Sequence, residues 1–95
     1  MKRVALDFDG VVHDYSGGWQ GFESIPGGLC PGIAEGIRAL NAAGYKVAII
    51  SSRARDAKGY KAIVAWLYAH GIDADEEIEM ITCEKEPAMA YIDDR

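Results

Sequence analysis

The chain has 95 residues, and its ten Lys and Arg side chains against fifteen Asp and Glu give a formal net charge of −5. A chain of this length buries enough surface for one hydrophobic core and too little for a second domain. We therefore expect a single domain over residues 1–95. The acidic balance disfavours nucleic acid and anionic membranes as partners.

The start of the chain and its cysteines bear on the compartment. The opening MKRVALDFDG has only Val4, Ala5 and Leu6 as an apolar run before a carboxylate, which is not the pattern of a signal peptide. No apolar run approaches the roughly 20 residues of a membrane-spanning helix. Cys30 and Cys83 lack CxxC or zinc-finger spacing, so we expect reduced thiols in apolar surroundings. These features predict a cytoplasmic protein with no membrane partner.

The first third of the chain predicts a strand followed by a long loop. Residues 3–8 (RVALDF) form a short, β-rich run that ends in carboxylates, which is typical of a buried strand. Residues 10–32 are rich in glycine and predict an irregular loop or a small flap. A loop of this length in a small domain is usually functional. Pro31 then opens a helix that Gly44 ends.

The remaining elements alternate in the same way. Residues 45–53 (YKVAIISSR) begin with the near-continuous apolar run of a strand buried on both faces. Asp56 is placed to cap a second helix, which Gly71 closes. Residues 80–83 (MITC) and 90–94 (AYIDD) predict a third and a fourth strand.

The predicted order βαβαββ, with right-handed helical crossovers, gives an α/β fold with a mainly parallel sheet. Three of the four strands end in reactive polar groups: Asp7 and Asp9, then Ser51, then Asp93 and Asp94. Ligands of open α/β sheets bind at the carboxyl ends of the strands, so we expect these groups to converge.

The residue types indicate phosphoryl chemistry. Four carboxylates brought together repel one another, and hard oxygen ligands of this kind suit Mg²⁺. Ser51 offers a hydroxyl donor for a phosphoryl oxygen, and Lys85 offers a compact positive charge. Carboxylates, Mg²⁺, a hydroxyl and a lysine are the components of phosphoryl-transfer sites.

Four motifs resemble those of the haloacid dehalogenase (HAD) superfamily. DFDGVVHD resembles its first motif, DxDGxx, and IISS resembles its second, a strand that ends in Ser or Thr. Lys85 is similar to the third-motif lysine, and YIDD to the acidic pair of the fourth motif. The four occur in family order over residues 3–95. The resemblance implies a three-layer Rossmann-like sandwich with a HAD-like core.

The resemblance also implies roles for the carboxylates. Asp7 would attack phosphorus and become an aspartyl phosphate. Asp9 would protonate the leaving oxygen and later activate water, and its presence points to phosphoryl chemistry rather than halide displacement. Mg²⁺ would be held by Asp7, the main-chain carbonyl of Asp9, and Asp93. Asp94 would bind the ion through a water molecule or would hydrogen-bond to its ligands.

The phosphoryl group would be bound by Ser51 and Lys85, with Gly10 and Ser52 beside them. Ser52 takes the role of Ser51 if the strand ends one residue later.

Three further residues are candidates for substrate contact. His13 lies just beyond Asp9, where it would touch the leaving group or face solvent from the flap. Arg53 and Arg55 follow the serines, and would grip a second anionic group of the substrate or form salt bridges with Asp56 or the acidic stretch 73–79. The aromatic rings of the flap would stack on the substrate or hold the flap down.

The chain departs from the family in two ways. It ends one residue after the acidic pair, whereas family members continue for a further strand and helix, and no segment is long enough for a cap domain. The resemblance is therefore to capless members, whose open sites serve large substrates or are completed by a second copy of the chain. We expect a small phosphorylated substrate, with a phosphorylated macromolecule as the alternative.

The sequence leaves three other functions open. A phosphotransferase or phosphomutase would need a lid that keeps water from the intermediate. A phospho-receiver domain uses the same residue types, but with the lysine last in the chain, whereas here the acidic pair follows Lys85. A non-catalytic module that binds phosphate or Mg²⁺ is the third alternative.

Overall fold

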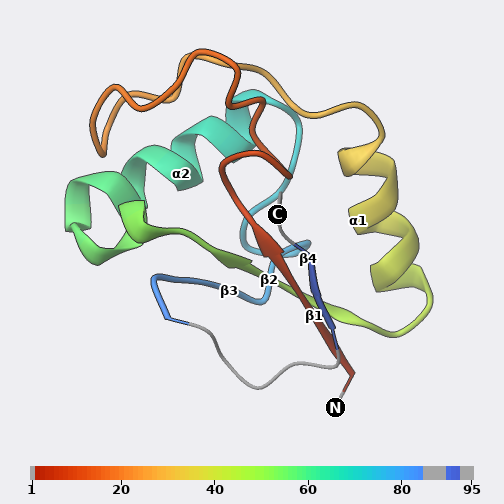
Figure 1. Cartoon of the computed structure of the whole chain (residues 1–95). Coiled ribbons are helices and arrows are strands. Elements are labelled where there is room, and N and C mark those ends of the chain that lie inside the picture. Colours follow the sequence, from red (N-terminus) through yellow and green to blue (C-terminus); the bar gives the residue numbers. More distant parts are fainter. Residues whose placement is uncertain (1, 85–89, 93–95) are drawn as a thin grey trace.

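The computed structural model describes residues 2–84 and 90–92 (Figure 1). Within these residues the strands are β1 (Arg3–Asp7), β2 (Lys46–Ile50), β3 (Met80–Thr82) and β4 (Ala90–Ile92), and the helices are α1 (Ile33–Ala42), α2 (Ala57–Ala69) and the short 3₁₀ helix η1 (Ser52–Arg55). The four described strands form one parallel sheet in the order β3-β2-β1-β4. The predicted order of strands and α-helices is confirmed.

The two central strands carry the core of the sheet. Residues 4–6 of β1 and 47–49 of β2 are all buried, as in parallel strands covered on both faces. The larger side chains of these strands belong to the same cluster as Ile37 of α1 and Ile63 of α2. Ala5 of β1 and Ala48 of β2 are register partners and point to the opposite face of the sheet. On that face the buried parts of the two central strands therefore carry only small side chains.

The helix ends follow the expected local chemistry. The Asp56 carboxylate accepts a hydrogen bond from the backbone N–H of Lys58 at 2.7 Å and caps α2. Gly44 and Gly71 follow the two helices with φ of 93° and 82°, left-handed values that favour glycine. The first helix begins at Ile33, directly after Gly32, which also has a positive φ of 79°.

The crossovers place both α-helices on one face of the sheet. The chain moves from β1 to β2 to β3 in one direction across the sheet, so right-handed connections put α1 and α2 on the same side. Figure 1 shows both helices above the sheet. Residues 83–89 join β3 to β4 and are fewer than the dozen or so of a helical crossover. The α/β class is confirmed, whereas the described elements form two layers and do not include the third layer of the expected sandwich.

The flap, residues 10–32, runs over the helical side of the molecule (Figure 1). It contains isolated bridges but no helix or strand. Two backbone hydrogen bonds close its base, from Asp14 N–H to the Gly28 carbonyl at 2.8 Å and from Cys30 N–H to the Val12 carbonyl at 2.9 Å. The indole N–H of Trp66 on α2 donates to the flap at 3.0 Å. The flap is thus tied both to itself and to the domain.

None of the helices in residues 2–84 combines the length and the apolar character that crossing a membrane requires.

Two helical glycines should respond oppositely to alanine. A Cβ at Gly59 of α2 would overlap the carbonyl oxygen of Arg53, whereas a Cβ at Gly36 of α1 would meet nothing within 4 Å. We expect Gly36→Ala to stabilise the fold by about 1 kcal/mol, because alanine is the better helix former. Gly59→Ala should destabilise it by about 1–3 kcal/mol through overpacking. Urea unfolding measures both, and two changes of the same sign would contradict this packing.

Candidate phosphoryl-transfer site

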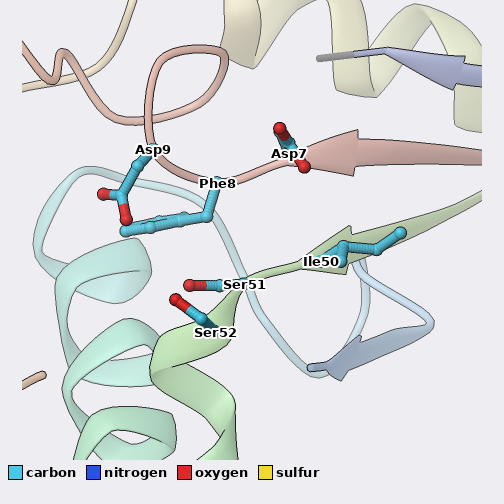
Figure 2. Close-up of a pocket in the computed structure, with 6 residues that line it drawn as sticks. All are labelled: Asp7, Phe8, Asp9, Ile50, Ser51 and Ser52. Carbon is cyan, nitrogen blue, oxygen red and sulfur yellow. The ribbon is translucent and has the colours of Figure 1, made fainter. Parts of the chain in front are cut away.

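A pocket of about 200 Å³ opens at the carboxyl ends of β1 and β2 (Figure 2). Its lining consists of consecutive residues at the two strand ends: Asp7, Phe8, Asp9, Ile50, Ser51 and Ser52. The pocket therefore contains four of the polar residues that the sequence predicts at one site: two carboxylates and two hydroxyls. Figure 2 shows Asp7 at the tip of β1, Asp9 on the following loop, and the serines beyond β2.

The pocket lies beside the point at which the strand order of the sheet reverses. From β1 the connection through α1 leads to β2 on one side, while β4 pairs with β1 on the other side. The strand order therefore reverses between β1 and β4, and the pocket lies next to this point, at the carboxyl ends of β1 and β2, the edge at which open α/β sheets bind ligands. Asp7 ends β1 and is half-buried at this point.

Asp9 is held by two buried side chains. Its Oδ2 accepts from Arg53 Nε at 3.0 Å, and its Oδ1 accepts from the terminal Nη2 of Arg53 at 3.2 Å and from Nδ1 of His13 at 2.8 Å. Arg53 Nε also lies 3.3 Å from Oδ1. Charge-assisted bonds from a planar guanidinium fix both the position and the rotation of a carboxylate. Oδ2 has fewer donors than Oδ1 and keeps capacity for a proton.

His13 connects Asp9 to the flap. Its ring is 1 % exposed and stacks on Phe8, with ring centroids 5.5 Å apart. The backbone N–H of Gly27 donates to His13 Nε2 at 3.0 Å, so Nδ1 carries the proton that is donated to Asp9. A Cβ at Gly27 would overlap the Asp14 carbonyl, so this close approach requires glycine.

The placement of His13 differs from both roles considered from the sequence. A ring this well buried does not face solvent from the flap, and its two nitrogens bind Asp9 and Gly27 rather than opening toward a leaving group. Sequence spacing gave no indication of the aromatic packing with Phe8 and Trp66 that buries it.

The two serines at the end of β2 have different environments. Ser51 is buried, and its Oγ accepts from the backbone N–H of Arg53 at 3.1 Å, so it caps η1. Its hydroxyl proton remains to be donated, since Oγ acts as acceptor in this bond. Ser52 is exposed. Of the two, Ser51 is held in the more fixed position.

Arg53 forms an ion pair, but with Asp9 rather than with Asp56 or the acidic stretch 73–79. Its guanidinium is fully buried, and its remaining terminal nitrogen donates to main-chain carbonyls of the flap. A grip on a second anionic group of the substrate would have to use donors that are engaged inside the protein. Arg55, in contrast, is exposed.

The aromatic rings of the flap lie beside Arg53. Trp19 and Phe22 pack edge to face with centroids 5.2 Å apart and are both exposed, Trp19 to 47 %. The Arg53 guanidinium lies 4.7 Å from the centroid of the Trp19 ring, within cation–π range. These contacts attach the flap to the region of the site.

The other predicted phosphate ligands are placed as follows. Gly10 has a φ of 94°, and its N–H donates to the His13 carbonyl at 2.8 Å, inside the turn after β1. Lys85, Asp93 and Asp94 lie outside the described residues. The backbone of Ile92, which precedes Asp93, pairs with Leu6, which precedes Asp7.

Two groups in the flap have shifted pKa values. The backbone N–H of Ser16 donates to Asp14 at 2.9 Å and lowers the pKa of that carboxyl. Burial raises the pKa of the Cys30 thiol, and the charge of Asp14 adds to the effect. Asp14 is therefore ionised and Cys30 is a neutral thiol at pH 7.

The donor set at the pocket suits a hard cation such as Mg²⁺, since it consists of carboxylate, hydroxyl and main-chain oxygens. Within residues 2–84 and 90–92, no three or more His, Cys, Asp and Glu side chains gather at one point. Both Asp9 oxygens already accept hydrogen bonds, so Asp9 would contribute its main-chain carbonyl beside the carboxylate of Asp7. These residues fit part of a magnesium site.

Comparisons of the chain with protein-family models, with curated proteins and with solved structures find no match.

The two serines should differ in their contribution to stability. Ser51→Ala removes the side-chain acceptor that caps η1, and loss of a cap costs about 0.5–2 kcal/mol. Ser52→Ala alters an exposed side chain, and a surface change of this kind stays within about 0.5 kcal/mol. Chemical denaturation of both variants measures the difference, and equal stabilities would contradict the assigned cap.

Proposed function

We propose that this protein is a Mg²⁺-dependent phosphatase of the HAD type, with a HAD-like core, which hydrolyses a phosphate monoester through an aspartyl phosphate. One observation carries the proposal: the carboxylates of Asp7 and Asp9 at the end of β1 and the hydroxyl of Ser51 after β2 line one pocket at the carboxyl edge of a parallel sheet. These groups match the order and residue types of the motifs DFDG and IISS.

In the first half of the reaction, Asp7 attacks phosphorus, and the bond from phosphorus to the ester oxygen breaks. The leaving oxygen takes a proton from Asp9, which Oδ2 has the capacity to carry. The Ser51 hydroxyl donates to a phosphoryl oxygen. The product of this half is an aspartyl phosphate on Asp7.

In the second half, Asp9 takes a proton from water as the water oxygen attacks phosphorus. The bond from phosphorus to Asp7 breaks and the carboxylate is restored. Mg²⁺, held by Asp7, the main-chain carbonyl of Asp9 and Asp93, would neutralise charge on the phosphoryl oxygens. Lys85 would add a second positive charge.

The size of the pocket bears on the substrate. Its volume of about 200 Å³ is below the roughly 300–1,000 Å³ of pockets that enclose a whole small molecule. The pocket therefore suits the phosphoryl group, with the leaving group outside. A leaving group that stays outside the pocket can belong to a small molecule or to a macromolecule. The uncrosslinked thiols of Cys30 and Cys83 support a reducing location such as the cytoplasm.

A non-catalytic module that binds phosphate and Mg²⁺ is the second candidate. It is favoured by the contacts of Asp9, whose two oxygens both accept hydrogen bonds from buried residues. A carboxylate held in this way would also serve to complete a binding site. Turnover separates the two candidates.

Phosphate release from an aryl phosphate is the deciding measurement. We expect turnover with Mg²⁺ and none with excess chelator. Asp7→Asn should abolish turnover by removing the nucleophile, and Asp9→Asn should lower it by about 10²–10⁴-fold. Asp56→Asn, an exposed change that keeps a capping side chain, is the matched control and should retain full activity.

Trapping of the intermediate distinguishes hydrolysis from the alternatives. With an activated aryl phosphate, whose leaving oxygen needs little protonation, Asp9→Asn should slow attack by water more than formation of the aspartyl phosphate, so a phosphoryl adduct on Asp7 should accumulate and appear in intact-mass spectra. Binding of Mg²⁺ and inorganic phosphate without any turnover or adduct would favour the non-catalytic module. Release of the aryl alcohol that requires an added acceptor, with the phosphoryl group recovered on the acceptor and not as free phosphate, would favour a phosphotransferase.

A further inference from the structure

Arg53 is a fully buried cation between the site and the flap. Its relative exposure is 0 %, although arginine is among the residues least often buried. A buried charge is tolerated only where it is paired and its hydrogen bonds are made. The contacts of Arg53 therefore show what it is placed to bind.

One side of the guanidinium binds Asp9. Nε donates to Oδ2 at 3.0 Å and Nη2 donates to Oδ1 at 3.2 Å, so two nitrogens face two carboxylate oxygens. This fork-to-fork arrangement restricts rotation of the carboxylate about its Cβ–Cγ bond, which a single donor does not.

The other side of the guanidinium binds the flap. Nη1 donates to the main-chain carbonyls of Gly21 at 2.7 Å and Ser24 at 2.8 Å, and lies 3.2 Å from that of Phe22. The ring of Trp19 lies against the guanidinium. Residues 19–24 contain no helix or strand, so their carbonyls have no hydrogen-bond partners from secondary structure, and Arg53 supplies donors to them.

We propose that Arg53 is a positioning residue for Asp9, and that it makes the orientation of the Asp9 carboxylate depend on the docking of flap residues 19–24. The catalytic role of Asp9 in this inference rests on the proposed function, whereas the physical coupling between Asp9 and the flap does not. Arg53 acts through Asp9, because its donors are turned to the carboxylate and the flap.

The coupling predicts a dependence on the leaving group. A misoriented Asp9 transfers its proton poorly, which matters for an alkyl phosphate with a basic leaving oxygen and little for an activated aryl phosphate. Arg53→Lys keeps the charge and loses the fork. We expect kcat/KM, which covers the steps up to the aspartyl phosphate, to fall about 10–100-fold for the alkyl phosphate and less than about threefold for the aryl phosphate.

The double variant separates positioning from a general loss of structure. In the Asp9→Asn background, Arg53→Lys should change kcat/KM for the alkyl phosphate by less than about twofold, since the group that it positions is already lost. Arg38→Gln removes another arginine ion pair, that with Glu77 at 2.9 Å on the helical side, and should not alter the preference between the two esters. The positioning role would be overturned if Arg53→Lys lowered kcat/KM equally for both esters. It would also be overturned if Arg53→Lys lowered kcat/KM as much in the Asp9→Asn background as in the wild type.

A readout independent of activity comes from NMR of the ¹⁵N-labelled protein. A buried, hydrogen-bonded Nε–H exchanges slowly with water, so Arg53 should give a sharp side-chain signal that Arg53→Lys removes. Asp9→Asn should speed its exchange about tenfold or more and shift the signals of the Trp19 indole and of residues 21–24. Unchanged flap signals would refute the coupling, and this holds even if Arg53→Lys does not fold.

The two proposals fail separately. If the wild type hydrolyses no phosphate ester, the proposed function falls, while the NMR experiment still decides whether Arg53 couples Asp9 to the flap. If the wild type turns over and the two esters respond alike to Arg53→Lys, the phosphatase stands and the positioning role falls.

Discussion

The buried ion pair between Arg53 and Asp9 is the interaction on which the site depends. It joins the loop after β1 to the segment after β2, and the same guanidinium holds the flap through main-chain carbonyls. Removing Asp9 would leave the fully buried Arg53 guanidinium without its counter-charge, which is more costly than losing a surface pair. The geometry of the candidate catalytic carboxylate and the position of the flap are therefore parts of one arrangement.

The parallel sheet supplies the frame for this arrangement. Because parallel strands bring their carboxyl ends to one edge of the sheet, the pocket opens at the end of β1, beside the end of β2. Asp7 occupies that position, and the buried Phe8 anchors the turn that brings Asp9 back toward Arg53.

The flap takes a larger part in the site than a surface loop would. Its Gly27 N–H fixes the tautomer of His13, and its carbonyls at Gly21 and Ser24 satisfy Arg53. Both of the side chains that hold Asp9 are thus themselves held by flap backbone. This makes the flap a structural support of Asp9 and not only a cover.

Most of the fold was predictable, because it follows from local patterns. Apolar runs fixed the strands, and Asp56, Gly44 and Gly71 marked the helix ends through capping chemistry and left-handed φ values. The third layer was the exception: it was expected from the family resemblance, and the described elements place both α-helices on one face. Adjacent strand ends also predicted that Asp7, Asp9 and Ser51 would meet, since parallel strands deliver their carboxyl ends to one edge.

The partners of Arg53 and His13 could not be read from the sequence. Arg53 is separated from Asp9 by 44 positions, and nearer acids such as Asp56 offered equally plausible pairs. His13 was expected to contact a leaving group or solvent and instead is buried against Phe8. The amino-acid sequence by itself determined the elements, their order and the residues at the strand ends, because these depend on local propensity and period. Only the tertiary structure decided which charges pair, because pairing depends on which long side chains are excluded from water together.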